Sequence, residues 1–414
     1  MKTAEIITTG SELVQGDVVN TNATYLAEEL TWLGLIILHH TTVPDELAAI
    51  SSAVERALER ADLVVITGGI GPTRDDVTRN AVATATGRTL IRDETALAQI
   101  KETFRCRQAD MPSSNIRQAM MPVGSIVITN RIGTAPGFSL RHNNREIICM
   151  PGVPIEMKWM FRDWVRPHLR AEIQSTIARL HRKLHVFGIH EAAIGEKIGH
   201  MMTPESKPSV GTMVNEGTIT LRIAAEAEDK TRAGKALDDA ETRIRRLLGD
   251  AVYGTGDDTL EGVVAALLKK HKKTIAVAES CTGGLVGNYL TDVPGASGYL
   301  LEDMVTYTYR SKSRLTGLPE SEIDKKGAVN ARTAKMMAKS IREKAGADLG
   351  LSITGAAGPT SRHPKERVGL VYCAIATRDG VKSKKFQFHG TRKWIKLMAA
   401  KSALNMLRLK LLAL

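Results

Sequence analysis

The sequence predicts an α/β protein in which a small α+β segment connects two large domains. Three observations support this fold class. Short apolar, β-branched runs alternate with amphipathic helical segments, as in parallel, doubly wound sheets. Polar turns rich in glycine follow several of these runs. From about residue 180 to residue 254 the alternation changes, and this stretch carries no acid–base cluster.

Length and composition bound the class of protein. At 414 residues the chain is too long for one ordinary core, and 43% hydrophobic with 25% charged residues is typical of a globular protein. The N-terminus has no long apolar stretch, so we expect a cytoplasmic protein without a membrane anchor. The four cysteines lack C-x-x-C spacing, which indicates reduced thiols. Only 4% of residues are aromatic, so we interpret the net charge of +12 as solvated surface that favours small anionic substrates over nucleic acid.

The N-terminal part shows the clearest alternation of strands and helices. Asn20 or Thr21 can cap a helix that ends at Gly34. In chain order we predict a strand at 3–9, that helix, a strand at 35–43, a helix at 46–61, a strand at 63–67, a helix at 79–86, and strands at 125–129 and 146–150. The turns at 130–137 and 151–156 are rich in proline and glycine, and their position after strands suggests one shared cleft.

The loop at residues 68–78 runs from the strand at 63–67 into a helix. A glycine-rich turn that opens a helix is suited to wrap a phosphate, and Asp75 and Asp76 at its mouth could hold a hard divalent cation. The alternative is a tight turn in which the aspartates cap the helix. The loop is neither a Walker A motif nor a Rossmann fingerprint.

The rest of the chain divides into a middle segment and a last domain. In the middle segment we expect strands at 183–188 and 218–225, helices at 191–201 and 232–248, and a linker at 252–258. The last domain is predicted to begin with a helix at 259–271, to have strands near Thr274, Met304, Leu349, Val368 and Lys382, and to have helices at 331–345 and 391–412.

The turn at residues 279–284 is the centre of this last domain. It follows a buried strand and precedes the helical spacing of Leu285, Val286, Tyr289 and Leu290, so free N–H groups at the helix start would suit an anion or a developing oxyanion. A serine N-cap followed by glycine punctuation is the plain alternative. Tyr307, Lys312 and the turn 353–359 end other strands, where open α/β sheets place their ligands.

These motifs resemble the CinA family, and the resemblance covers essentially the whole chain. Segments 9–12, 21–22, 68–78, 130–137 and 151–156 resemble the family's molybdopterin-binding-like domain, which is associated with metal-dependent hydrolysis of ADP-ribose. The middle segment resembles its KH-like module. The resemblance implies three domains at residues 1–170, 171–254 and 255–414, the last an α/β CinA amidase domain.

The last domain is similar to the family's nicotinamide mononucleotide deamidase. The matching residues are the segment 278–284, Tyr307, Lys312, the turn 354–359 and Arg392. The resemblance implies that Ser280 attacks the amide, Lys312 acts as base and Tyr307 orients or relays, with Cys281 as the rival nucleophile. Lys312 can act as base only if burial or nearby positive charge lowers its pKa. Arg392, with backbone near Gly283 and Gly355, would hold the 5′-phosphate, and Thr354 would contact the substrate.

The candidate site residues can be grouped by role. Expected substrate contacts in the last domain are Thr282, Gly283, Gly284, Thr354, Gly355 and Arg392. Those in the first domain are Gly10, Ser11, Asn22, Gly68, Gly69, Gly71, Thr73, Gly133, Thr134, Pro151 and Gly152. A divalent cation such as Mg²⁺ would bind Asp75 and Asp76, with Glu12 and Glu156 as further candidates, and the deamidase site would need no cofactor. We expect nicotinamide mononucleotide and ADP-ribose as ligands, a homodimer, and neither membrane nor nucleic acid as partner.

Two other functions stay open at this point. The first is a molybdopterin-binding or molybdopterin-transferring protein, which would require pterin-selective binding. The second is a nucleic-acid binder of DNA uptake that uses its KH-like module and net positive charge. That function would require a basic stripe and a GXXG loop, which the middle segment does not show.

Overall fold

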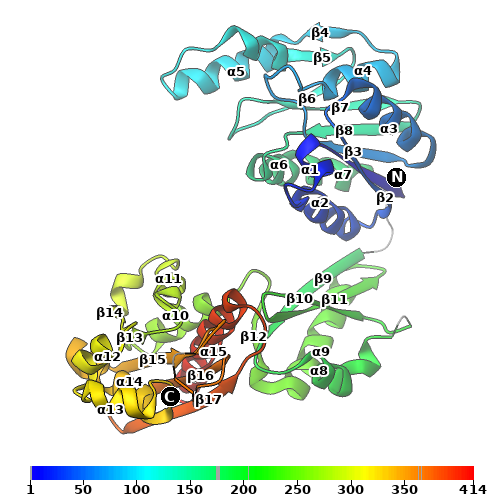
Figure 1. The fold of residues 1–414 in the computed structure, drawn as a ribbon. Coiled ribbons are helices and arrows are strands. Elements are labelled where there is room, and N and C mark those ends of the chain that lie inside the picture. Colours follow the sequence, from blue (N-terminus) through cyan, green and yellow to red (C-terminus); the bar gives the residue numbers. More distant parts are fainter. Residues whose placement is uncertain (1, 174–177, 204, 362, 365) are drawn as a thin grey trace. The chain divides into compact units, whose positions relative to one another are not determined.

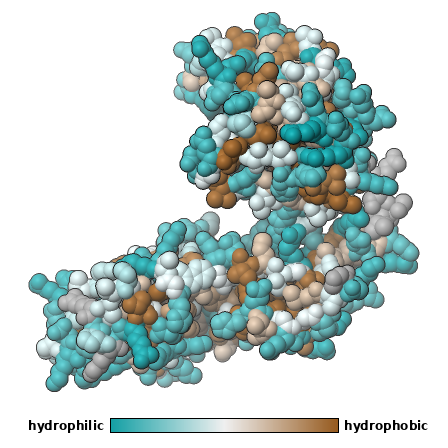
Figure 2. Space-filling view, turned by 45° about the vertical axis from the view of Figure 1, so that its right-hand side comes forward, coloured by the Kyte–Doolittle hydropathy of each residue, from teal (hydrophilic) through white to brown (hydrophobic). Residues whose placement is uncertain are grey.

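The computed structural model describes residues 2–173, 178–203, 205–361, 363–364 and 366–414. The chain divides into two compact units, residues 1–179 with 227–230 and residues 180–226 with 231–414. Within the described part of the chain, no helix is both long and apolar enough to span a lipid bilayer. On the face shown in Figure 2, hydrophilic residues surround scattered hydrophobic areas, as expected when most apolar side chains fill the cores.

The first unit is a three-layer α/β/α domain (Figure 1). Its strands are β1 (Thr3–Thr9), β2 (Ile36–Val43), β3 (Leu63–Thr67), β6 (Ile126–Ile128), β7 (Gly137–His142) and β8 (Arg145–Met150), in the sheet order β2-β1-β3-β8-β7-β6. A separate two-stranded sheet pairs β4 (Leu90–Arg92) with β5 (Met120–Pro122). The helices are α1 (Ser11–Gln15), α2 (Thr21–Trp32), α3 (Leu47–Arg60), α4 (Thr78–Thr86), α5 (Glu94–Cys106), α6 (Pro154–Met160) and α7 (Arg166–Glu172).

Both faces of this sheet are buried by helices, which explains the continuous apolar runs of the central strands. Ile50, Val54 and Ile100 of α3 and α5 fill one core, and Leu26, Met157 and Leu169 of α2, α6 and α7 fill the other. The sheet is not parallel throughout. β7 is antiparallel to β8, and β6 is antiparallel to β7, because the short turn at Asn143 and Asn144 makes a hairpin. β6 therefore again runs in the direction of β1, β3 and β8.

The second unit begins with the KH-like module. It has a sheet in the order β10-β11-β9-β12, formed by β9 (Ala178–Val186), β10 (Ser209–Asn215), β11 (Thr218–Ala227) and β12 (Val252–Thr255), and the helices α8 (Glu191–Ile198) and α9 (Lys230–Leu248). β10 is antiparallel to β11, and β12 is antiparallel to β9. The segment predicted as a linker, 252–258, begins instead with strand β12, which pairs with β9. In the folded strand, Val252 and Gly254 are buried and alternate with half-buried residues. In the sequence, the only indication of this strand was the pair Val252 and Tyr253 at its start.

The last domain is again a sheet covered on both faces. Its strands are β13 (Ile275–Glu279), β14 (Leu300–Val305), β15 (Leu349–Gly355), β16 (Leu370–Thr377) and β17 (Gly380–Gln387), in the order β14-β13-β15-β16-β17. Its helices are α10 (Leu260–Lys270), α11 (Leu285–Thr291), α12 (Tyr309–Thr316), α13 (Glu320–Lys326), α14 (Ala331–Ala345) and α15 (Arg392–Leu412). The strands β14, β13 and β15 are parallel to one another, so their carboxyl ends lie at one edge of the sheet. β16 is antiparallel to β15, and β17 is antiparallel to β16.

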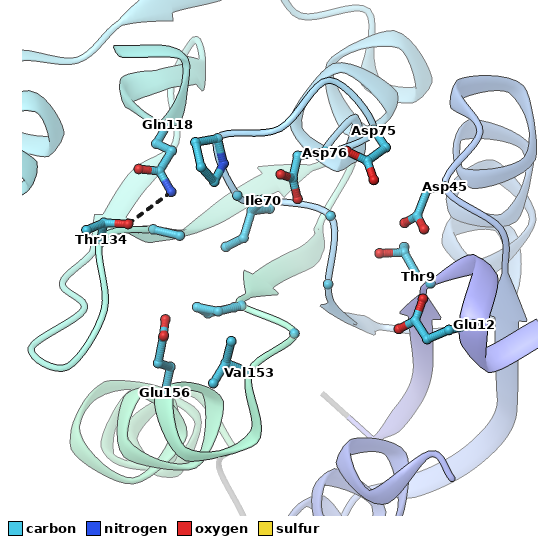
Figure 3. Close-up of a pocket in the computed structure, with 18 residues that line it drawn as sticks. Thr9, Glu12, Asp45, Ile70, Asp75, Asp76, Gln118, Thr134, Val153 and Glu156 are labelled. Atoms are coloured by element: carbon cyan, nitrogen blue, oxygen red, sulfur yellow. Dashed lines mark hydrogen bonds between the residues drawn. The ribbon is translucent and has the colours of Figure 1, made fainter. Parts of the chain in front are cut away.

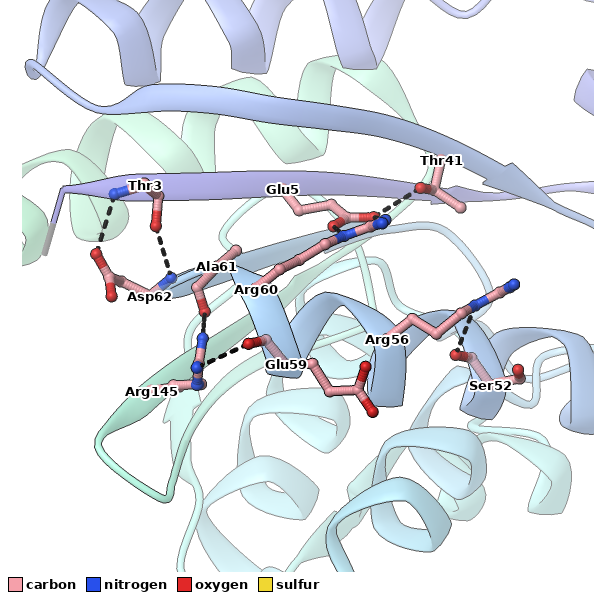
Figure 4. A network of polar contacts seen from close by, with 10 residues as sticks. All are labelled: Thr3, Glu5, Thr41, Ser52, Arg56, Glu59, Arg60, Ala61, Asp62 and Arg145. Atoms are coloured by element: carbon pink, nitrogen blue, oxygen red, sulfur yellow. Dashed lines mark hydrogen bonds and ion pairs between the residues drawn. The ribbon is translucent and has the colours of Figure 1, made fainter.

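An ion pair between the buried Glu5 and the largely exposed Arg60 ties the sheet of the first unit to α3 (Figure 4). Glu5 on β1 is fully buried, and its carboxylate accepts hydrogen bonds from Arg60 (2.8 Å to each oxygen) and from Thr41 on β2 (2.7 Å). Burial by itself raises the pKa of Glu5, but the hydrogen bonds from Arg60 and Thr41 outweigh it, so that the pKa lies below its usual value. The charged form of Glu5 thus depends on Arg60.

We predict that Arg60→Ala lowers the thermal midpoint of the first unit at pH 7 by roughly 5 °C, since a buried carboxylate loses its partner. The loss should shrink as the pH falls from 7 into the acidic range, because protonated Glu5 no longer carries the buried charge. Scanning calorimetry at pH 4 and pH 7 measures both effects. Arg56→Ala is the matched control, because Arg56 lies exposed on the same helix and contacts only the Ser52 carbonyl in Figure 4. Equal losses in the two variants would contradict the role of the ion pair.

Candidate functional site

The first unit contains a cavity of about 390 Å³ at the carboxyl ends of its parallel strands (Figure 3). The predicted residues that line it are Gly10, Gly68, Gly69, Gly71, Thr134, Pro151, Gly152, Asp75, Asp76, Glu12 and Glu156. Asp45 and Gln118 also line it and were not predicted. Parallel strands that end at one edge bring these distant segments together, as the shared cleft required.

The glycine loop after β3 adopts a backbone that only glycine tolerates easily. Gly68 and Gly69 have φ angles of +108° and +63°. A Cβ on Gly68 would collide with the Thr9 carbonyl oxygen, and one on Gly69 would collide with Thr78 Oγ1. The Thr78 hydroxyl also donates to the Gly68 carbonyl at 3.0 Å. The tight approach of loop, strand and helix therefore requires both glycines.

A buried arginine of α4, Arg79, is hydrogen-bonded to main-chain carbonyls of this loop. Arg79 is 2% exposed and donates to the carbonyls of Ile70 (2.6 Å) and Gly71 (2.9 Å). Burial lowers the pKa of Arg79 to about 10, which still leaves it charged at neutral pH. Sequence analysis placed Arg79 only at the start of a helix. The available signal was a charged residue beside the apolar residues of α4.

Five carboxylates surround the same cavity, those of Glu12, Asp45, Asp75, Asp76 and Glu156 (Figure 3). Asp76 is oriented by Thr73, whose main-chain N–H lies 2.8 Å from Oδ2. A hydrogen bond from Thr73 lowers the pKa of the exposed Asp75. Among the residues that the structure describes, no three His, Cys, Asp or Glu side chains cluster closely enough to hold a metal ion by themselves. The donor set suits Mg²⁺, which usually takes one or two carboxylates and completes its shell with phosphate oxygens and water.

Four predicted contacts support the walls of this cavity but do not line it. The main-chain N–H of Ser11 donates a hydrogen bond to Asp45 Oδ2 at 2.9 Å. The side-chain amide of Asn22 donates to Thr67 Oγ1 (3.0 Å) and to the Gly152 carbonyl (2.8 Å). Thr73 orients Asp76, as described above. Gly133 donates its N–H to Asn130 Oδ1 at 2.8 Å.

The last domain contains a second cavity of about 330 Å³ where β13, β14 and β15 end. The predicted residues that line it are Ser280, Cys281, Tyr307, Lys312, Thr354, Gly355 and Arg392. Thr282, Gly283 and Gly284 do not line it. Thr354 is fully buried, and its hydroxyl donates to the Ala328 carbonyl at 3.1 Å. This hydrogen bond joins β15 to the segment before α14.

Ser280 and Lys312 form a direct hydrogen bond within the protein interior. Lys312 is 2% exposed, and its Nζ lies 2.7 Å from Ser280 Oγ, 2.7 Å from the Thr306 carbonyl oxygen and 3.4 Å from the Tyr307 carbonyl oxygen. The two carbonyls can only accept. A neutral amine has two N–H groups for the carbonyls and one lone pair, which then faces the serine hydroxyl. The geometry thus allows Lys312 to accept the serine proton without rearrangement.

The neighbouring thiol lacks the properties of a nucleophile. Cys281 is 5% exposed, and burial raises its pKa to about 12 although the charge of Lys312 opposes the shift. A reactive cysteine needs a lowered pKa, because the thiolate is the attacking species. Of the two side chains at this turn, the structure therefore favours Ser280.

The free N–H groups expected at the start of α11 are already used within the protein. The fully buried carboxylate of Glu279 accepts hydrogen bonds from the N–H groups of Gly284 (2.9 Å), Val286 (2.8 Å) and Gly287 (2.8 Å). Gly283 donates to the Ser280 carbonyl at 3.2 Å. This helix start does bind an anion, but the anion is the protein's own Glu279 carboxylate, from the residue before Ser280, and not a group of a ligand. The glycines shape the turn with φ angles of +65° and +91°.

Tyr307 and Arg392 act together at the mouth of the cavity. Arg392 Nη2 donates to the Tyr307 hydroxyl at 2.8 Å, and Nη1 donates to the Gly358 carbonyl at 2.6 Å. Tyr307 is 58% exposed. The tyrosine hydroxyl accepts a hydrogen bond from the arginine, and the main-chain carbonyl of Tyr307 contacts Lys312.

A second carboxyl group, that of Asp303, lies beside the Glu279 carboxylate and the three N–H groups that it binds, an arrangement called here the Glu279 clamp. Asp303 on β14 packs against Gly287, where a Cβ would collide with the carboxylate of Asp303. Burial of the Asp303 carboxyl, and then the negative charge of Glu279, raise its pKa to about 7, although much of the residue remains exposed. Asp303 is therefore partly protonated at neutral pH.

Known families match all three parts of the chain. Residues 5–171 match the probable molybdopterin binding domain, 181–254 the damage-inducible protein CinA KH domain and 257–411 the CinA C-terminal domain. A putative competence-damage inducible protein of Caldicellulosiruptor saccharolyticus is 40% identical over 405 residues, 98% of each chain. A CinA-like protein of Kosmotoga olearia is 40% identical over 412 residues, 99% of each chain. A crystal structure of CinA from Thermoplasma acidophilum is 38% identical and covers 40% of this chain and 97% of its own, with a TM-score of 0.38.

Fold and matched domains together define a three-domain α/β protein with a molybdopterin-binding-like domain, a KH-like module and a CinA C-terminal domain. The chain belongs to the CinA family. Both cavities lie inside the segments matched by the first and last family models.

We predict that Asp303→Asn raises the thermal midpoint of the second unit at neutral pH and leaves it unchanged at pH 4. The pKa of Asp303 is raised in the folded protein, so the stability that its protonated form contributes is complete below about pH 4 and is lost as the pH rises toward 7. Asparagine keeps a hydrogen-bond donor beside Glu279 at every pH. The midpoint difference between variant and wild type should be near zero at pH 4 and reach about 2–4 °C above pH 7. A constant difference from pH 4 to pH 8, measured by calorimetry, would rule out titration of Asp303.

Proposed function

We propose that the last domain deamidates nicotinamide mononucleotide to nicotinic acid mononucleotide and ammonia. The observation that carries this proposal is the 2.7 Å hydrogen bond between buried Lys312 and Ser280, in a cavity that also contains Arg392. A serine–lysine pair can form and hydrolyse an acyl-enzyme. The arginine offers a planar fork for a phosphate monoester at the other end of the substrate.

The reaction can be written with the chain's own groups. Ser280 Oγ attacks the amide carbon while Lys312 takes the hydroxyl proton, and the carbonyl oxygen becomes an oxyanion. Lys312 then returns the proton to the amide nitrogen, so the C–N bond breaks, ammonia leaves and an ester to Ser280 remains. Water, deprotonated by Lys312, attacks the ester. Lys312 then returns this proton to Ser280 Oγ as the ester C–O bond breaks, and the nucleotide leaves as a carboxylic acid that ionises at neutral pH.

The oxyanion needs hydrogen-bond donors other than those of α11. Glu279 occupies the N–H groups of Gly284, Val286 and Gly287. The candidates are the main-chain N–H groups that directly follow Ser280 in the sequence, those of Cys281 and Thr282. An N–H of the residue after the nucleophile serves this purpose in other serine hydrolases. Glu279 would then fix the turn on which these donors lie.

We predict that Ser280→Ala and Lys312→Met each lower kcat for deamidation by about 10³-fold or more, because nucleophile and base act as one unit. Cys281→Ala should keep activity within about fivefold, since it removes only a packing contact beside Gly355. Release of ammonia and formation of nicotinic acid mononucleotide are measured by a coupled assay and chromatography. Thermal midpoints near the wild-type value show that each variant is folded. Loss of activity in Cys281→Ala with activity retained in Ser280→Ala would make this a thiol enzyme.

For the first unit, we propose metal-dependent hydrolysis of ADP-ribose to AMP and ribose 5-phosphate. The support is the cavity that combines the close-packed glycine loop with five carboxylates. A divalent cation bound by Asp75 and Asp76 would neutralise the diphosphate and lower the pKa of a bound water. The chain's part is to orient Asp76 through Thr73 and to hold the loop through Arg79.

We predict that Asp76→Asn lowers ADP-ribose hydrolysis by about 100-fold or more and leaves deamidation unchanged, because the amide keeps the Thr73 hydrogen bond but loses the charge. EDTA should abolish the wild-type hydrolysis, and added Mg²⁺ should restore it. Asp110→Asn is the control, since Asp110 is an exposed acid outside the cavity. Chelator-resistant hydrolysis, or loss of both activities in a folded Asp76→Asn protein, would contradict this assignment.

The match to a molybdopterin binding domain favours one alternative for the first unit, binding of a pterin without hydrolysis. Equilibrium titration with a molybdopterin precursor and with ADP-ribose separates the two. Pterin binding with no turnover of ADP-ribose would support the alternative.

A further inference from the structure

The cavity of the last domain contains an acidic residue that the proposed reaction does not use. Glu366 is 7% exposed and lines the same cavity as Ser280 and Arg392. One carboxylate oxygen, Oε1, accepts the N–H of Val329 at 2.9 Å. This hydrogen bond fixes the side chain against the segment that precedes α14.

The second carboxylate oxygen is open to the cavity. Among the described residues no hydrogen bond to Glu366 Oε2 is formed, and this atom is not among the buried side-chain atoms without a partner. It is therefore reached by solvent. Because the rest of the residue is buried and the residue lines the cavity, the reachable side is the cavity side.

A carboxylate in this position selects ligands by its charge. It accepts strong hydrogen bonds from hydroxyl or amide donors and repels a phosphate. In nicotinamide mononucleotide the donors are the carboxamide and the two ribose hydroxyls. The carboxamide has to lie at Ser280 and Lys312, and the phosphate has to lie at Arg392. The ribose lies between them, so its hydroxyls are the donors that remain for Glu366.

We infer that Glu366 is a specificity-determining residue that binds the 2′- and 3′-hydroxyls of the substrate ribose. This inference rests on the proposed deamidase function and adds the substrate class, which is ribonucleotides and not free nicotinamide or deoxyribose analogues. The buried carboxylate loses a partner when a hydroxyl is missing, which penalises such analogues more than a simple lost contact does.

The test compares wild type and Glu366→Gln on two substrates, nicotinamide mononucleotide and its 2′,3′-dideoxy analogue. The substitution is not expected to disturb the fold, because the amide oxygen of the new side chain can still accept the Val329 N–H. Glu366→Gln should lower kcat/KM for the ribonucleotide by about 10–100-fold, mainly through KM, and change the value for the dideoxy analogue less than about threefold. Glu320→Gln, at the exposed start of α13, is the matched control and should change neither value.

Two kinetic outcomes overturn the inference. If Glu366→Gln lowers turnover of both substrates equally, Glu366 contacts the carboxamide or shapes the cavity and does not bind the ribose. If it lowers neither, the residue has no role in recognition. If the wild type turns over neither substrate, the proposed function fails, and calorimetric titration with the two nucleotides decides the inference separately. Equal affinity of wild type for both then overturns it, and weaker binding of the dideoxy analogue that disappears in Glu366→Gln supports it.

Discussion

The position of Ser280 depends on the carboxylate of Glu279. This side chain ends β13, is fully buried, and accepts three main-chain N–H groups of the following turn and helix. Without it, three donors at the start of α11 would be buried without acceptors, and each would cost about 1–3 kcal/mol. The clamp fixes the direction in which the chain leaves the strand. Ser280, the next residue, is thereby held against Lys312 across two neighbouring strand ends.

In the first unit, a buried cation in place of a buried anion satisfies the main-chain groups of the loop that follows a central strand. The glycine loop of this unit exposes carbonyl groups to the interior, and Arg79 donates to two of them. In both domains a buried charged side chain satisfies the backbone of the loop that follows a central strand, so the loop can be rich in glycine and still rigid. Buried charges are tolerated only where such partners exist. The loops can then bind ligands without first losing much conformational freedom.

The sequence predicted the elements that patterns specify locally. The strands β1, β3 and β13 are built on short apolar, β-branched runs, and α14 and α15 show helical spacing with caps, so these elements lie close to where they were expected. The antiparallel pair β7 and β8 was missed because the hairpin turn at Asn143 and Asn144 was not weighed as a turn signal. For the site, the shared strand edge was predictable from topology, whereas the pairing of Ser280 with Lys312 was expected only from the resemblance to the CinA family.

Other site residues could not be predicted, because their roles exist only through contacts made by the folded chain. Glu279 could have been a solvent-facing acid, and only its burial beside α11 makes it a clamp. Asp45 and Gln118 reach the first cavity from segments with no motif of their own. Glu366 lies 86 residues beyond Ser280 in the sequence (366 − 280 = 86) and meets its cavity only because β16 returns beside β15.

Charge explains why the two cavities would treat phosphates differently. The described residues that line the first cavity include five carboxylates and neither lysine nor arginine, so a diphosphate that enters alone would be repelled. Cations that bind with the substrate would remove that repulsion, which is the physical reason to expect metal dependence there. The second cavity is lined by two basic residues, Lys312 and Arg392, and by one acidic residue, Glu366. Arg392 stands at its mouth, paired with Tyr307 and Gly358, where a phosphate monoester can be neutralised by the protein itself while Glu366 stays with the neutral part of the nucleotide.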